Sequence, residues 1–144
     1  SFVGEEGSVR FFAETAGAEA AAQQRARVGD SRMLASAMLA FRHEVEALYA
    51  GDTPPEERAA KRAAAETRAR AAIAALPLTS RDPARLAVDV RLSDACLALT
   101  RTYAADVDAY AATLATLDDS LPAFIARLRE AAETKDPRAA LLAH

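Results

Sequence analysis

The stretch that decides the fold is residues 93–117, which read SDACLALTRTYAADVDAYAATLATL. Its apolar and aromatic side chains recur at intervals of three or four residues, at Cys96, Leu99, Tyr103, Val107, Tyr110, Leu114 and Leu117. This spacing matches one face of an α-helix with 3.6 residues per turn. Ser93 stands directly before the pattern, where a serine hydroxyl can cap the first turn. The stretch therefore predicts one long amphipathic helix.

The segments before this stretch predict two further helices. Residues 30–50 are closed by Gly51 and carry an apolar stripe made of Leu34, Met38, Phe41, Val45 and Leu48. Residues 53–75 open on Thr53-Pro54-Pro55-Glu56, which is typical of a helix start because threonine can cap and proline loses no bond there. The inner face of the second segment is nearly all alanine. We therefore expect this helix either to lie close against a neighbouring helix or to be only lightly attached. It also carries two acid-before-base pairs four residues apart, Glu57 with Lys61 and Glu66 with Arg70.

The rest of the chain completes an all-helical pattern with short loops. Residues 77–83 begin and end with proline and indicate a break. Apolar and polar residues then alternate near 85–92, which predicts a short extended segment, although a helix with a misleading pattern is the alternative. Residues 118–120 predict a turn, and residues 121–128 and 136–142 predict two last helices. An all-α, up-and-down helical bundle is the expected architecture.

Composition bounds the size and the function classes. The chain has 144 residues, a formal net charge of -3 and 6% aromatic residues, and we expect a single helical domain over 1–144. Acidic residues outnumber basic ones, 21 to 18, so no nucleic acid partner is expected. No apolar run is long enough for a membrane span. Cys96 alone forms no intramolecular disulfide, and its expected place is the apolar core.

Few residues suggest catalysis by themselves. His43-Glu44 looks like half of a zinc-hydrolase helix motif, but position 47 is alanine where the second histidine would stand, so we expect a solvated surface histidine. The acidic residues are expected to serve as helix caps and solvated charges rather than as a carboxylate metal site. Tyr103 and Tyr110 share the apolar stripe and are expected to pack in the core. The alternative for Tyr103 is a hydroxyl donor facing a cleft.

Several stretches together resemble the C-terminal part of a bacterial family classed as zinc aminopeptidases. The most specific is Ser1-Phe2-Val3-Gly4-Glu5-Glu6-Gly7-Ser8-Val9-Arg10-Phe11-Phe12. The others are Leu48-Tyr49, Gly51-Asp52, Glu57-Arg58, Asp94-Ala95 with Leu97 and Tyr103, and residues 121–124. In zinc peptidases of this kind one helix carries a His-Glu-x-x-His motif. A second helix carries an Asn-Glu ligand that leads into a run like Phe2-Val3-Gly4.

The resemblance implies that the metal ligands belong to a part of the parent protein upstream of Ser1. The chain would then be the C-terminal domain of a longer zinc peptidase, inactive alone, with no cofactor of its own and zinc in the parent. Its partners would be the N-terminal catalytic portion of that parent and a peptide substrate. The resemblance also implies that Tyr103 stabilises the oxyanion of the reaction. Glu5 and Glu6 would support the ligand helix without binding the metal themselves.

Two other functions stay open from the sequence alone. A stand-alone helical bundle could act as a protein–protein interaction module, with its alanine faces receiving a partner helix. A carboxylate metal site inside the bundle is the third hypothesis. If the chain is an excised part of a longer protein, we expect the first helix to expose Phe2, Phe11 or Phe12, or to bury them by self-association. The sequence indicates no particular compartment.

Overall fold

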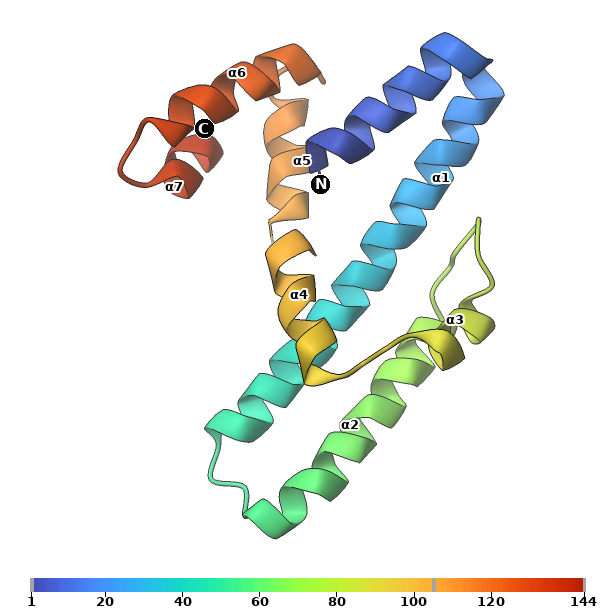
Figure 1. The fold of residues 1–144 in the computed structure, drawn as a ribbon, viewed down its shortest axis with the longest axis vertical. Coiled ribbons are helices and arrows are strands. Elements are labelled where there is room, and N and C mark those ends of the chain that lie inside the picture. The colour runs from blue at the N-terminus through green and yellow to red at the C-terminus, as the bar shows by residue number, and fades with distance from the viewer. Residues whose placement is uncertain (1, 105, 144) are drawn as a thin grey trace. The chain divides into compact units, whose positions relative to one another are not determined.

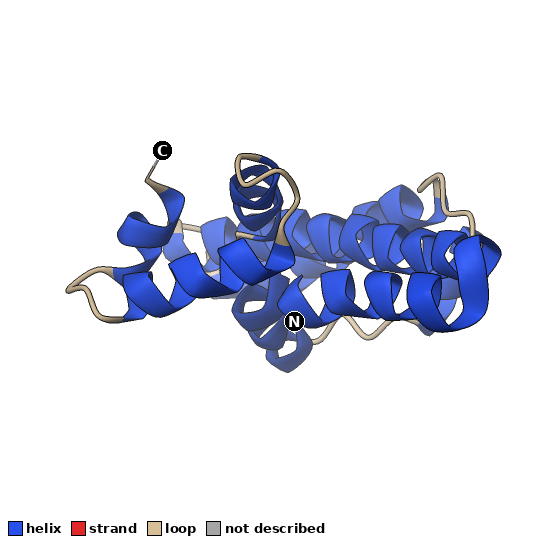
Figure 2. Ribbon diagram, turned by 90° about the horizontal axis from the view of Figure 1, so that it is seen from above, coloured by secondary structure: helices blue, strands red, loops and turns tan. Residues whose placement is uncertain are grey.

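The computed structural model describes residues 2–104 and 106–143, with the side chains of residues 2–100 and 106–143. Within this part of the chain all regular structure is helical, as Figures 1 and 2 show. The helices are α1 (Phe2–Ala50), α2 (Pro55–Ala74), α3 (Pro83–Asp89), α4 (Asp94–Ala104), α5 (Val107–Ala115), α6 (Leu121–Ala132) and α7 (Pro137–Leu142). The prediction of an all-α helical bundle is confirmed. In the described residues no helix is long and apolar enough to cross a membrane.

The chain divides into two compact units. The terminal unit comprises Ser1–Gln24 and Asp106–His144, and the central unit comprises Arg25–Ala105. Each unit has its own apolar cluster. The sequence predicts a single helical domain over residues 1–144, and the division into two compact units leaves this as a prediction.

Alanine allows the helices of the central unit to pack closely. The buried face of α2 consists of Ala65, Ala69 and Ile73, which lie four residues apart on one side of the helix. Ile73 has no exposed surface. Around this face lie the large buried side chains of the cluster, which are Phe41, Val45, Leu92 and Leu97. The alanine-lined face of α2 is therefore buried, as the sequence predicts for close packing.

A buried carboxylate fixes the break between α2 and α3. Asp30 lies on α1 with 1% of its surface exposed and accepts bonds from both hydroxyls and both amides of Thr79 and Ser80. The Ser80 hydroxyl donates to Oδ2 at 2.6 Å, and the Ser80 amide donates to the same oxygen at 2.7 Å. These bonds stabilise the charged form and, led by the Ser80 hydroxyl, lower the pKa of Asp30 to about 2. Asp30 thus holds the predicted break against α1.

The terminal unit is built around the first residues of the chain. Phe2 is buried against Phe124 of α6 and Tyr110 of α5, with ring centroids 5.4 and 5.9 Å from its own. Gly17 interrupts α1 with φ 87° and ψ 179°, a conformation open essentially to glycine alone. Beyond this kink the chain runs back, and Gln24 donates to the Ser8 hydroxyl at 3.1 Å. Arg10 donates to the backbone oxygen of Asp119 in the turn between α5 and α6.

Caps and turns account for most helix ends. The Cys96 amide donates to the Ser93 hydroxyl at 3.4 Å, which confirms the predicted cap of α4. Ser120 and Asp136 cap α6 and α7 in the same way. At α2 the predicted cap is wrong. The helix begins behind Pro54 without a side-chain cap, and the Thr53 carbonyl accepts a bond from Arg58 Nε at 2.9 Å.

The long helix predicted over residues 93–117 is in fact two helices. Asp106 has φ 67°, a left-handed conformation that cannot continue a right-handed helix, and α5 begins at the next residue. Arg138 forms two hydrogen bonds with the Asp106 carboxylate. Its Nε donates at 2.7 Å and its Nη2 donates at 2.6 Å. The predicted apolar face also differs in α4, because Leu99 is 59% exposed and Leu97 is buried instead.

The extended segment expected near 85–92 is only partly extended. Residues 85–89 belong to α3, which Asp82 caps by accepting from the Ala84 amide at 2.9 Å. The chain becomes extended at Val90, with φ −63° and ψ 133°. A cap and a proline at the first turn therefore outweigh the alternating pattern, which is too short to specify a strand without a partner.

Candidate functional site

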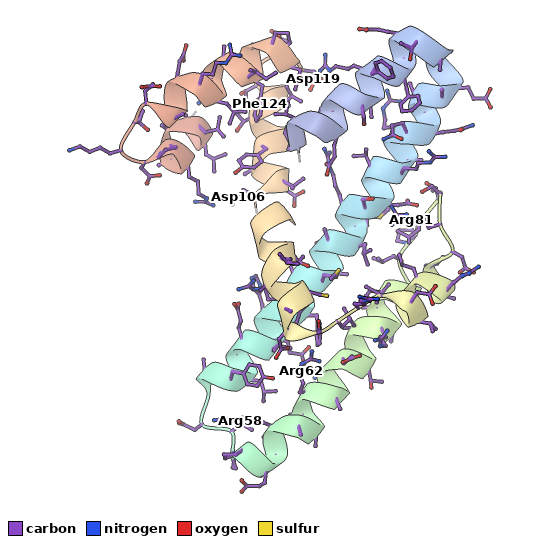
Figure 3. The ribbon with its side chains drawn as sticks, in the orientation of Figure 1. Arg58, Arg62, Arg81, Asp106, Asp119 and Phe124 are labelled. Carbon is purple, nitrogen blue, oxygen red and sulfur yellow. The ribbon has the colours of Figure 1, made fainter. Side chains whose placement is uncertain are left out.

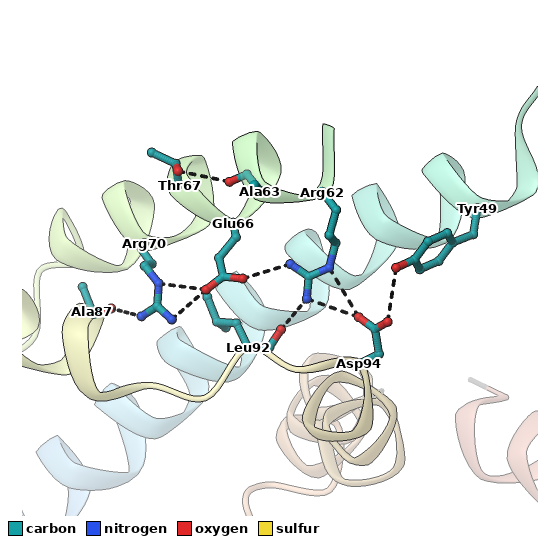
Figure 4. Close-up of polar contacts among 9 residues, drawn as sticks. All are labelled: Tyr49, Arg62, Ala63, Glu66, Thr67, Arg70, Ala87, Leu92 and Asp94. Carbon is teal, nitrogen blue, oxygen red and sulfur yellow. Dashed lines mark hydrogen bonds and ion pairs between the residues drawn. The ribbon is translucent and has the colours of Figure 1, made fainter. Parts of the chain in front are cut away.

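A chain of charged side chains joins three segments of the central unit, as Figure 4 shows. At its centre is Arg62 on α2, whose side chain is 16% exposed. Its Nη1 donates to Glu66 at 3.1 Å. Its Nη2 donates to the Leu92 carbonyl at 2.5 Å and to Asp94 Oδ1 at 3.2 Å. The arginine thus fixes the extended segment and the first turn of α4 against α2.

The same row of charged side chains continues along α2 through residues spaced four apart. Glu66 also accepts from Arg70, at 3.1 Å from Nε and 2.8 Å from Nη2, which confirms one of the predicted acid-before-base pairs. Arg70 Nη1 then donates to the Ala87 carbonyl at 2.5 Å. The bond from Arg70, with that from Arg62, holds the pKa of Glu66 below its usual value. Glu66 is therefore a charged bridge between two arginines.

Tyr49 stands at the solvent-exposed end of this row of polar side chains. Its hydroxyl lies 3.3 Å from Asp94 Oδ2, and the residue is 47% exposed. Asp94 itself stands in the first turn of α4, where a negative charge interacts favourably with the helix dipole. An exposed hydroxyl is therefore held by a carboxylate whose other oxygen is fixed by Arg62.

Two open pockets adjoin the pair formed by Tyr49 and Asp94. The first, about 240 Å³, has an apolar floor and is lined by Arg42, Val45, Glu46, Tyr49, Asp94, Leu97 and Ala98. The second, about 660 Å³, lies at the start of α2 and is lined by Tyr49, Pro55, Arg58, Ala59, Arg62, Ala63, Glu66, Ser93 and Asp94. Figure 3 shows Arg58 and Arg62 extending from α2. Residues from three segments distant in sequence thus line one hollow surface.

The structure describes only some of the residues singled out from the sequence. Tyr103 belongs to α4, but its side chain lies outside the described residues, so its predicted role stays a prediction. Glu5 and Glu6 lie in the first segment of α1, where both are half-buried and both have interaction partners. Phe11 in the same segment is 60% exposed, whereas Phe2 is buried.

The described residues do not fit a zinc site. They contain no group of three or more histidine, cysteine, aspartate or glutamate side chains that could hold a metal ion. His43 is exposed on α1, as predicted, and Cys96 is half-buried rather than fully buried in the core. Zinc sites in proteins are built from three or four converging ligands.

The sequence does not reveal that Arg62 stands at the centre of this network. The spacing of Arg62, Glu66 and Arg70 was a readable signal for contacts along the helix. The contacts of Arg62 to Leu92 and Asp94 had no such signal, because they join positions about 30 residues apart. Tyr49, Arg58 and Asp94 belong to three separate stretches of the family resemblance, and the structure brings all three to the 660 Å³ pocket.

The fold and this surface define an all-helical protein with a charged, solvent-open pocket. A family model described as "Putative aminopeptidase" matches residues 1–142. Because the match covers nearly the whole chain, the chain belongs to this aminopeptidase family. Searches of curated proteins and of solved structures gave no match.

Proposed function

We propose that this chain is the C-terminal helical portion of a bacterial zinc-dependent aminopeptidase and is inactive alone. The family match over residues 1–142 is the observation that carries the proposal. The resemblance of Phe2-Val3-Gly4 to the continuation of a zinc-ligand helix supports it. In this account the His-Glu-x-x-His motif and the Asn-Glu ligand stand upstream of Ser1, and zinc binds there.

The chain's own contribution is to support the ligand helix. Phe2 anchors the first segment of α1 in the aromatic cluster with Tyr110 and Phe124. Arg10 adds a bond to the turn between α5 and α6. A ligand one helical turn before Ser1 would be oriented by these contacts, and the orientation of ligands by their surroundings strongly affects metal affinity. In this proposal Glu5 and Glu6 support the ligand helix, and Tyr103 stabilises the oxyanion, as the resemblance implies.

The coding sequence before Ser1 provides the first test. The proposal expects a His-Glu-x-x-His helix and, about one turn before Ser1, an Asn-Glu pair. A gene that encodes neither would contradict the proposal and favour the interaction module instead. The exposed apolar side chains Phe11, Val88 and Leu99 would then be the first residues to examine for partner contacts.

The second test measures the support given by Phe2 in the protein made from the whole gene. We expect Phe2→Ala to weaken zinc retention against a chelator by about tenfold, the range seen when groups that orient metal ligands are removed. Phe11→Ala is the matched control, because Phe11 is a phenylalanine of the same helix segment that is 60% exposed. Equal zinc retention in the two variants would contradict the supporting role.

A further inference from the structure

The 660 Å³ pocket contains a cation that the surrounding network does not neutralise. Of its lining residues, Glu66 is bonded by Arg62 and Arg70, and Asp94 is bonded by Arg62. Arg58 has no carboxylate partner among the residues that the structure describes, and its Nε donates to a backbone carbonyl. The pocket lining thus holds two arginines and two carboxylates, and Arg62 bonds both carboxylates. Arg58 is the arginine of this lining that is left without a carboxylate partner in the described part of the chain.

The guanidinium of Arg58 is anchored by one hydrogen bond. Its Nε donates to the Thr53 carbonyl at 2.9 Å, and the residue is half-buried at the wall of the pocket. Within the described part of the chain its two Nη atoms have no acceptor. The pair of Nη atoms matches the two oxygens of a carboxylate, and such bidentate pairs are stronger and more specific than contacts of a point charge. An anchored guanidinium also loses less conformational freedom when a ligand binds.

The rest of the pocket suits a peptide backbone. Tyr49, whose hydroxyl is bonded to Asp94, and Ser93, whose hydroxyl caps α4, line its wall, and Ala59 and Ala63 provide a small apolar surface. A volume of about 660 Å³ lies within the range that small ligands occupy in proteins. The carboxylates of Glu66 and Asp94 would repel an anion if they were unpaired, but arginines bond both of them.

We propose that this pocket binds the carboxylate of a peptide, with Arg58 as its anchor and the Tyr49 hydroxyl beside it. The inference deepens the proposed function, on which it rests for the ligand being a peptide. The anion recognition itself depends on the geometry of the central unit. Two sources share the chemistry, the C-terminal carboxylate of a peptide and an acidic side chain within one.

The test titrates the ¹⁵N-labelled chain, without zinc or hydrolysis, with three acetylated alanine tripeptides and follows backbone and arginine Nε signals by NMR. One peptide has a free C-terminus, one is amidated, and one is amidated with glutamate at its middle position. We expect the free acid to shift Arg58 Nε and the Ser93 amide saturably, and the amidated trialanine to bind at least about tenfold more weakly, the size expected for charged hydrogen bonds. Binding by the glutamate peptide would assign the carboxylate to a side chain, and its failure would assign it to the C-terminus.

Variants separate Arg58 from charge in general. Arg58→Gln should weaken binding of the free acid at least about tenfold, and Arg58→Lys, which keeps the charge but not the planar pair of donors, should weaken it several-fold. Arg68→Gln removes the same charge from the same helix but lies outside the pocket, so binding should be unchanged. Near-native amide spectra establish folding in each case, and Arg58→Lys remains informative if Arg58→Gln does not fold. Equal affinity for acid and amide, the absence of saturable shifts, or an equal loss in Arg68→Gln would overturn the inference. Each of these results leaves the zinc proposal untouched.

Discussion

Arg62 and Asp94 lie 32 residues apart in the chain, and Arg62 Nη2 stands 3.2 Å from Asp94 Oδ1. This contact ties α2 to the first turn of α4 and fixes the carboxylate that Tyr49 contacts. The same guanidinium lies 4.7 Å above the ring of Phe41, so the polar chain and the apolar core of the central unit meet at one residue. The wall of the pocket is therefore part of what holds the unit together.

Replacing Arg62 should destabilise the chain. Arg62→Met removes the donor of the Leu92 carbonyl, one bond to each of Glu66 and Asp94, and the cation over the Phe41 ring. We expect a loss of about 2 kcal/mol in the free energy of unfolding, measured by urea titration. Arg85→Gln is the control, because the ion pair of Arg85 with Asp89 is exposed and should contribute less than about 0.5 kcal/mol. Equal losses in both variants would mean that the network stabilises no more than a surface pair.

The core of the central unit depends on Ile73. Ile73→Ala removes a fully buried side chain from a face otherwise made of alanine, and we expect a loss of about 2–5 kcal/mol in the free energy of unfolding. Val88→Ala, at a residue that is 76% exposed, should change it by less than about 0.5 kcal/mol. A small effect at Ile73 would show that α2 is only lightly attached.

Asp30 makes stability depend on acid pH. The bonds from Thr79 and Ser80 lower its pKa in the folded chain to about 2, from 3.8. Folding is therefore favoured by the charged carboxylate, and this contribution is complete above about pH 4 and is lost as the pH falls through about 2. Asp30→Asn should melt at a lower temperature than wild type at pH 7, and the gap should narrow between pH 4 and pH 2. A gap that is constant over this range would contradict the bonding seen at Asp30. Ser80→Ala, which removes one of the bonds, should show a smaller gap of the same form.

The left-handed backbone at Asp106 should favour glycine over alanine. Asp106→Gly and Asp106→Ala both lose the pair with Arg138, so the difference between them isolates the backbone at φ 67°. We expect the alanine variant to be less stable by about 1 kcal/mol in thermal or urea unfolding. If alanine proves as stable as glycine, the break between α4 and α5 does not need this conformation.

The sequence predicts local features well and distant ones poorly, and Asp106 shows why. The Ser93 cap and the pair of Glu66 with Arg70 depend on neighbours within four residues, so spacing alone reveals them. The apolar spacing in the sequence continues past Asp106 without interruption. Val107, Tyr110 and Leu114, which follow Asp106, belong to the apolar cluster of the terminal unit. Asp106 directly precedes α5 and is held by Arg138, 32 positions later, and no local signal reports that contact. The pocket around Arg58 is hidden for the same reason, because Tyr49, Ser93 and Asp94 reach it from other segments.

Hydrolysis of an aminoacyl p-nitroanilide, measured together with zinc content, shows whether residues 1–144 are inactive without the part of the protein proposed to bind zinc. The chain of residues 1–144 and the protein made from the whole gene are compared under identical conditions. We expect the chain alone to bind no stoichiometric zinc and to show no rate above buffer, whereas the longer protein should carry zinc and lose its activity to a chelator. Zinc-dependent hydrolysis by residues 1–144 alone, or a longer protein with neither zinc nor activity, would contradict this expectation.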